Sequence, residues 1–301
     1  MLENKNLKKQ ENLWNKAVND RDINVSMILR KLTLDVIDVE TVYPLGKQQF
    51  YDIGITSVKN NNQVAYTKSY IISDIFDDPV KMASAYYKEK IPFYESKLLT
   101  DNSYEKLSAQ ETIDRIEKHF KDNDIRVYFA YNGSFDRLAL INTYNEYYDQ
   151  ENPFLYRKVV DIMYLAIQII IGNPDIYEEY MEFCYENKFI TPSGKNISFS
   201  AQSVYAFLLN RPLFQENHTG LEDTFCEKDL LIMLVLYYEN KYHKDLIIHC
   251  LKDKQTTCLL PYVRQGGKLN IEKAQTIVET RKQQKIKKKG FFTLLKELCK
   301  K

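Results

Sequence analysis

The first part of the chain alternates short apolar runs with polar turns. Strand-forming residues fill 33–39, 50–60 and 64–72, and the polar cluster "KNNNQ" (59–63) separates the last two runs. Runs of this length, rich in Val, Ile, Tyr and Phe and bounded by turn residues, are typical of β-strands, and the cluster between two of them favours a hairpin. We therefore predict a three-stranded antiparallel meander near the start of a domain.

Further along, segments with helical spacing of apolar residues alternate with short strand-like runs. The predicted helices cover 108–120, 134–148, 198–210 and 222–240, and the predicted strands cover 126–132 and the start of 158–170. Ser108, followed three residues later by Glu111, forms the capping-box pattern of a helix start. Strands first, then alternation of helix and strand, predict an α/β fold with a mixed sheet and helices on its faces.

The two ends of the chain differ from this central part. Residues 1–31 are polar with scattered apolar positions and predict one or two surface helices. We expect a core domain over 32–240, with an insertion at about 173–198, and a helical, basic extension over 241–301. The last 21 residues, 281–301, hold nine basic residues and one acidic residue. This segment suits a solvated tail, a phosphate contact or docking to a partner protein, and the residues alone do not separate these roles.

Composition limits the class of protein. Apolar residues make up 44% of the chain, charged residues 28%, and the net charge is +1, so the total charge gives no sign of a nucleic-acid partner. No apolar leader and no run of about 18 apolar residues is visible, so we expect no secretory signal and no membrane span. Five cysteines without CxxC spacing argue against a disulfide framework or a zinc site, and suit a cytoplasmic protein.

Two carboxylates stand where the first apolar run, "LTLDVIDVETVYP" (32–44), approaches its end. Asp38 and Glu40 are two residues apart, so in a strand they point to the same face. Like charges side by side against an apolar run repel each other. Taken alone, an Asp-x-Glu pair is more often a solvated feature of a strand edge or turn. A cation between the two side chains is the other explanation.

Three more candidates lie at the beginnings of predicted helices. Asp136 follows the strand in "AYNGSFDR", and His218 and Asp223 lie in "HTGLEDT". Each alone suits a helix start, where a carboxylate is favoured by the helix dipole. If the sheet brings these ends together, the four carboxylates require cations, and two Mg²⁺ or Mn²⁺ ions are the natural choice for oxygen ligands. His218 would then supply a base near neutral pH.

These motifs resemble those of the DEDDh-type, DnaQ-like 3′→5′ exonucleases. "DVIDVET" is similar to their first motif, "AYNGSFD" to the second, usually A-H-N-x-x-F-D, and "HTGLEDT" to the third, H-x-A-x-x-D. The spacing of His218 and Asp223 is that of the histidine branch, because Thr219 stands where the other branch has Tyr. Tyr131 and Gly220 replace a common His and a common Ala, and neither change removes a ligand.

The resemblance implies a fold and a set of roles. The fold is RNase H-like, a five-stranded mixed sheet flanked by helices, with a helical segment before it and a helical extension after it. The implied roles are catalysis by His218 with Glu40, metal binding by Asp38, Glu40, Asp136 and Asp223, and contact with the terminal nucleotide by Thr41, Val42 and Asn132. Asp161 suits a supporting role near the site or a simple strand-end role.

Several functions fit these residues. The first is a two-metal 3′→5′ exonuclease that releases nucleoside monophosphates from single-stranded DNA ends, in proofreading or DNA processing, with 241–301 docking to a polymerase or another replication protein. The second is an exoribonuclease of the same branch, which the shared motifs do not separate from the first. The third is a non-catalytic replication accessory module, which predicts at least one lost ligand, whereas all five key residues are present.

Overall fold

The computed structural model describes residues 2–19, 22–59, 62–249, 257–258 and 269–284. The chain forms two compact units, which are described separately. The first consists of Met1–Asp161, Asn217–Lys228 and Asp245–Leu259, and the second of Ile162–Glu216, Asp229–Lys244 and Leu260–Lys301. In the described part of the chain, no helix combines the length and apolar character needed to cross a membrane.

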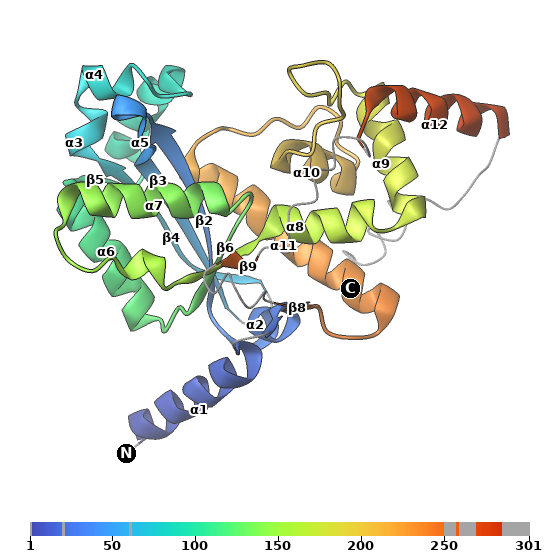
Figure 1. Ribbon diagram of the computed structural model, residues 1–301. Helices are drawn as coiled ribbons and strands as arrows, with labels where there is room; N and C mark the ends of the chain where they lie inside the picture. Colours follow the sequence, from blue (N-terminus) through green and yellow to red (C-terminus); the bar gives the residue numbers. More distant parts are fainter. Residues whose placement is uncertain (1, 20–21, 60–61, 250–256, 259–268, 285–301) are drawn as a thin grey trace. The chain divides into compact units, whose positions relative to one another are not determined.

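A seven-stranded mixed sheet forms the centre of the first unit (Figure 1). Its strands, in spatial order, are β5 (Tyr104–Leu107), β4 (Gln63–Ile72), β3 (Gln49–Lys59), β2 (Leu34–Val42), β6 (Val127–Ala130), β7 (Lys158–Asp161) and β9 (Thr257–Cys258). β2, β3 and β4 form the predicted antiparallel meander, and the other neighbouring pairs are parallel. The predicted mixed sheet flanked by helices is confirmed, and β5 and β9 extend its two edges beyond five strands.

Helices α6 (Ala109–Asp122) and α7 (Ser134–Tyr147) cover one face of this sheet (Figure 1). α6 begins with the predicted capping box between Ser108 and Glu111. Its apolar stripe, with that of α7, packs on alternate residues of β2 and β3, including Ile37, Val39 and Ile53. The intervening residues of these strands therefore face the opposite side of the sheet, which is the side of Asp38 and Glu40.

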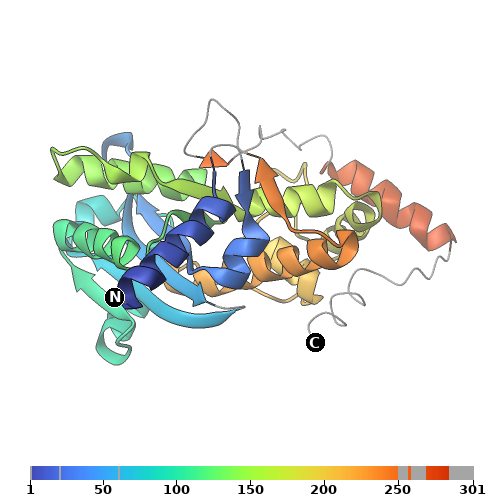
Figure 2. The same ribbon diagram turned by 90° about the horizontal axis from the view of Figure 1, so that it is seen from below.

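Shorter elements complete the first unit. They are α1 (Leu2–Ala17), β1 (Asp22–Asn24), α2 (Val25–Lys31), α3 (Ser73–Phe76), α4 (Pro79–Met82), α5 (Ile91–Thr100) and β8 (Ile247–His249). β1 and β8 pair antiparallel and lie side by side in Figure 2. The segment predicted as surface helices thus contains α1 and α2, and in addition a short strand that pairs with residues beyond 240.

The second unit is helical. It contains α8 (Ile162–Ala166), a π-helical turn at Ile167–Ile171, α9 (Pro174–Glu186), α10 (Ala201–Leu209) and α12 (Ile271–Gln284). Helix α11 (Gly220–Tyr242) begins in the first unit and ends in the second. The expected insertion at 173–198 contains α9. The domain boundaries at 31 and 240 stay predictions, and most of the basic tail, 285–301, lies outside the described residues.

Candidate active site

Strand β2 carries the first two candidate ligands. Asp38 and Glu40 share one face of the strand, while Ile37 and Val39 on the other face lie in the apolar core. The pairing between β2 and β3 shifts register just after Glu40. Such a bulge increases local twist and can re-aim a side chain at the end of a strand. The packing of Ile37 and Val39 in the core therefore makes β2 a rigid support for the two carboxylates on its other face.

The first turn of α11 brings Asp223 to these carboxylates. One oxygen from each of Asp38, Glu40 and Asp223 lies within 4.8 Å of the other two. The Thr219 backbone N–H donates to Oδ2 of Asp223 at 3.2 Å, which fixes the side chain at the helix N-terminus. The structure thus brings together three residues that are 185 positions apart at the extremes, and all three offer oxygen ligands.

A contact between two glycines allows this approach. Gly54 of β3 is the cross-strand partner of Asp38, and a Cβ at Gly54 would lie 2.1–2.3 Å from backbone atoms of Gly220 and Leu221. A Cβ at Gly220 would lie 2.6 Å from the Gly54 nitrogen. The Gly220 N–H donates to Oδ2 of buried Asp52 at 2.9 Å. Gly220, which departs from the family pattern, therefore meets a packing requirement of this chain.

Asp136 and Asp161 join the site from the ends of β6 and β7. Asp136, in the first turn of α7, is buried, and its Oδ1 accepts from the Val39 backbone N–H at 3.2 Å. Buried Asp161 accepts from the Asn132 backbone N–H at 3.0 Å. Asn132 has φ of 61°, a left-handed conformation that Asn tolerates better than most residues. These bonds hold the β6–α7 turn so that Asp136 points toward β2.

The surroundings of Asp38 disfavour the ionised form of its carboxyl group. Burial raises the pKa of Asp38 well above its usual value, and the nearby charges that raise it further are Glu227, Asp136, Asp223 and Glu40, in that order. Within the described ranges, no hydrogen-bond donor reaches the Asp38 carboxylate. Buried carboxylates in such a group need cations to remain ionised. A hard divalent cation such as Mg²⁺ or Mn²⁺ fits this all-oxygen donor set.

His218 lies immediately before α11 with φ of 55°. Its imidazole stacks on the ring of Tyr87, with centroids 4.2 Å apart and planes 5° from parallel. Burial, and then the positive charge of Lys90, lower the pKa of His218. A lowered pKa leaves the ring neutral at neutral pH, which is the form that can accept a proton. The stack on Tyr87 limits the orientations of this ring.

Of the three residues predicted to touch the substrate, Asn132 is exposed, whereas Thr41 and Val42 are buried. Thr41 is 4% exposed and Val42 0%, so their side chains offer almost no surface to a nucleotide. The exposed side chains of this segment come just after, at Tyr43 and Leu45. The Tyr43 N–H donates to Ser84 Oγ at 2.9 Å, which joins this segment to the loop that carries Tyr86 and Tyr87.

One further acidic residue in this region was not predicted. Glu227 is buried, and its Oε2 accepts from the Tyr131 backbone N–H at 3.1 Å. It lies four residues after Asp223 on a predicted helix, so both side chains share a helix face. This four-residue spacing was the sign in the sequence that could have identified Glu227. The third motif, "HTGLEDT", ends before it.

A buried acid–histidine pair lies outside the site. His119 Nε2 is 2.9 Å from Oδ2 of Asp35, and the Ser57 hydroxyl donates to Oδ1 of Asp35 at 2.6 Å. The ring of Tyr66 stacks on His119. Asp35 is thus a structural partner of His119 in the core. This network stabilises the packing of α6 on the sheet.

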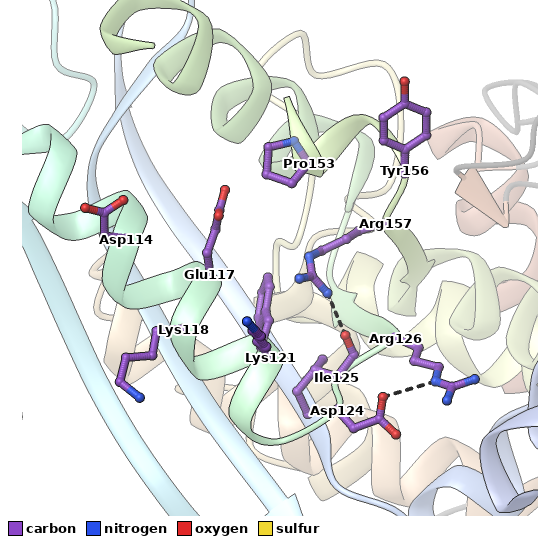
Figure 3. Close-up of a pocket in the computed structure, with 11 residues that line it drawn as sticks. Asp114, Glu117, Lys118, Lys121, Asp124, Ile125, Arg126, Pro153, Tyr156 and Arg157 are labelled. Atoms are coloured by element: carbon purple, nitrogen blue, oxygen red, sulfur yellow. Dashed lines mark hydrogen bonds and ion pairs between the residues drawn. The ribbon is translucent and has the colours of Figure 1, made fainter. Parts of the chain in front are cut away.

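A surface hollow lies at the other ends of the strands (Figure 3). It is lined by the end of α6, by Arg126 just before β6 and by Arg157 just before β7. Figure 3 shows Arg126 paired with Asp124 and Arg157 bonded to the Ile125 carbonyl. None of the predicted site residues lines this hollow, whereas the carboxylates gather at the opposite, carboxyl ends of β6 and β7.

Burial gives the cation-free protein a defined pH dependence. Burial raises the pKa of Asp52 to about 6 and that of Asp223 to about 7. A group with a raised folded-state pKa holds its proton more tightly when folded, so its stabilisation is lost as pH rises through that pKa. In EDTA, we expect the free energy of unfolding to fall between about pH 5 and about pH 7.5 in urea titrations. Asp52→Asn should flatten part of this slope, and a stability that rises across the window contradicts the prediction.

Comparison with known proteins gives a limited result. No protein-family model and no curated protein matches the chain. A structure of E. coli exonuclease I with a dT13 oligonucleotide has a TM-score of 0.46 at 10% identity, covering 71% of this chain and 43% of that chain. A second, with a dA16 oligonucleotide, has a TM-score of 0.41 at 12% identity, covering 70% and 41%. The match therefore spans less than half the length of those chains, and the functional assignment depends on the side chains of the site.

Proposed function

We propose that the protein is a metal-dependent 3′→5′ exonuclease that acts on single-stranded DNA and releases nucleoside monophosphates. The observation that carries the proposal is the convergence of Asp38, Glu40 and Asp223 within 4.8 Å, with the charge of Asp136 acting on Asp38. The order of the three motifs along the chain supports the direction of digestion through the family that they resemble.

Each side chain has a role in this reaction. Asp38, Glu40 and Asp223 would hold one divalent cation, and Asp38 with Asp136 would hold a second. When bound, the cations stabilise the negative charge that develops on the attacking and leaving oxygens of the phosphodiester. His218 accepts the proton of the attacking water at a ring nitrogen, because its lowered pKa keeps the ring neutral.

An exposed rim beside His218 supports a single-stranded substrate. Tyr43 is 41% exposed, Tyr86 is 77% exposed and Leu45 is fully exposed. Tyr86 packs edge-on against Tyr87, whose ring stacks on His218. Aromatic side chains near a strand-binding site stack on unpaired bases without reading their sequence. We infer that bases next to the scissile bond rest on this rim, which a stacked duplex cannot reach.

The rim gives a test of substrate binding. Tyr86→Ala should raise KM for a single-stranded oligomer about tenfold, because one base–aromatic stack contributes about 1–3 kcal/mol, and should change kcat little. Steady-state kinetics on an unstructured labelled oligomer measure both constants. Tyr156→Ala is the matched control, since Tyr156 is 67% exposed, against 77% for Tyr86, but lines the distant hollow. Equal KM values for the two variants would contradict a role of Tyr86 in binding.

The direction of digestion tests the function itself. Oligonucleotides labelled at the 3′ or the 5′ end are incubated with the protein and Mg²⁺ or Mn²⁺. We expect immediate loss of the 3′ label as a mononucleotide, and no loss after His218→Ala. Release of the 5′ label first, or activity that survives His218→Ala, would exclude this reading of the site. Matched DNA and RNA oligomers in the same assay distinguish a deoxyribonuclease from the alternative, an exoribonuclease, because the two substrates differ at the 2′-OH.

A further inference from the structure

We propose that Asp52 is a positioning residue of the active site. It holds the N-terminus of α11, and with it His218 and Asp223, against the strand that carries Asp38 and Glu40. This inference rests on the proposed function and deepens it, because Asp52 would act through the backbone of α11 and not on the substrate.

Asp52 is fully buried on β3, and both of its carboxylate oxygens accept hydrogen bonds. The Ser69 hydroxyl of β4 donates to Oδ1 at 2.6 Å, and the Tyr94 hydroxyl of α5 donates to Oδ2 at 2.8 Å. The Gly220 N–H donates to the same Oδ2 at 2.9 Å. Hydrogen bonds to an ionised acceptor are stronger than those between neutral groups. One carboxylate therefore ties the start of α11 to two neighbouring elements of the first unit.

The bond to Gly220 caps α11 from another part of the chain. The first N–H groups of an α-helix have no partner inside the helix, and the side chain that precedes the helix often accepts one of them. Here the hydroxyl of Thr219 donates to Oε2 of Glu222 at 2.8 Å, and the Gly220 N–H finds its acceptor 168 positions earlier. The carboxylate of Asp52 also suits the positive end of the helix dipole.

The place of Asp52 on β3 links α11 to the ligands on β2. Asp52 is the cross-strand partner of Glu40, and Gly54 is the cross-strand partner of Asp38. Residues two apart on a strand share a face, so Asp52 and Gly54 both meet the start of α11 on the face that carries the two carboxylates. The bond at Asp52 thus fixes α11 relative to the strand that holds Asp38 and Glu40.

The segment that Asp52 holds lies between the proposed base and a proposed ligand. Gly220 comes two residues after His218 and three before Asp223. His218 has φ of 55°, a left-handed conformation that residues other than glycine adopt rarely and that persists where surrounding contacts fix it. The bond from the Thr219 N–H to Asp223 is made within this segment, whereas the bond to Asp52 ties the segment to the sheet. Loss of Asp52 would therefore let both side chains shift relative to β2.

Three variants separate positioning from support of the fold alone. Asp52→Ala removes the acceptor of the Gly220 N–H. Asp52→Asn is the conservative variant, because its amide oxygen can accept from Gly220 and Tyr94 while its amide nitrogen donates to the Ser69 oxygen. Ser69→Ala is the matched control, since it removes one bond from the same carboxylate and leaves the bond to Gly220 in place.

The experiment is a calorimetric titration of the full chain with Mn²⁺, without substrate and well below the melting temperature of each variant. Asp52→Ala should bind Mn²⁺ about 10- to 100-fold more weakly than the wild type, and Asp52→Asn and Ser69→Ala should remain close to it. Unchanged affinity in Asp52→Ala, or an equal loss in Ser69→Ala, would overturn the proposal. A loss in Asp52→Asn as large as in Asp52→Ala would assign the effect to charge and overturn it as well. If Asp52→Ala does not fold, Asp52→Ser, whose oxygen ends one bond earlier, replaces it with the same expectations.

Metal binding and activity fail separately in this design. With labelled oligomers, Asp52→Ala should lower kcat about 100-fold and change KM little, because the reacting groups shift while the exposed rim stays in place. Weakened Mn²⁺ binding in Asp52→Ala beside a wild type that digests no oligomer would reject the exonuclease and retain Asp52 as a positioning residue of a metal centre. A digesting wild type with unchanged Mn²⁺ affinity and kcat in Asp52→Ala would retain the exonuclease and reject the role of Asp52.

Discussion

Asp38→Asn should lower the rate of 3′-end digestion at least about 1000-fold, because Asp38 is the ligand shared by both proposed cations and the site acts as a unit. The same substitution should raise the melting temperature of the cation-free protein. Burial and four neighbouring carboxylates act against the ionised form of Asp38, so removing its charge relieves repulsion. Loss of activity with gain of stability is the signature of a site whose strain serves function.

The two effects are measured on the same samples. Thermal melts in EDTA and in Mg²⁺ give the stabilisation by cations, and labelled oligomers give the rate. The wild type should gain stability on addition of Mg²⁺, and Asp38→Asn should gain little. A ligand stabilises a folded protein only to the extent that the folded protein binds that ligand. Asp114→Asn on α6, exposed at the distant hollow, is the control and should behave as the wild type. An Asp38→Asn protein that still digests DNA, or that melts lower in EDTA, would contradict this account.

The elements that sequence patterns predict well are those determined locally. The meander of β2, β3 and β4 follows from three runs of strand-forming residues and the turn residues between the last two, and α6 from its capping box. The face shared by Asp38 and Glu40 follows from strand geometry alone. Their meeting with Asp223 was predicted from the order of three motifs, and the structure brings the three oxygens together.

The features that were missed depend on contacts between segments far apart in the chain. The edge strands β5 and β9 are too short to show a period, and they form only against β4 and β7. Asp35 and His119 are 84 positions apart, and neither carries a local sign of the other. The stack of His218 on Tyr87 likewise depends on how two loops meet. The helical spacing of Glu227 from Asp223 predicts that the two side chains share a helix face. Whether Glu227 lies near Asp38 depends on where α11 packs, which the spacing does not show.

Gly54→Ala should reduce activity about 100-fold or more although Gly54 touches none of the reacting groups. Its Cβ would lie 2.1–2.3 Å from backbone atoms of Gly220 and Leu221, and backbone cannot turn aside as a flexible side chain can. The N-terminus of α11 must then move away from β3, carrying Asp223 and His218 with it. A displacement of about 1 Å at reacting groups lowers rates about 100-fold, and overpacking of this kind costs about 1–3 kcal/mol.

The clash predicts which measurements change together. Gly54→Ala should lower the free energy of unfolding in EDTA, weaken Mn²⁺ binding at the site that includes Asp223, and lower kcat, whereas Asp38→Asn should stabilise the cation-free protein. Gly194→Asn is the control, because Gly194 has open space around it and a φ of +69° that Asn accepts. Near-wild-type activity of Gly54→Ala would show that α11 can shift away from β3 without displacing Asp223 and His218. The contact between the two glycines would then have no consequence for the site.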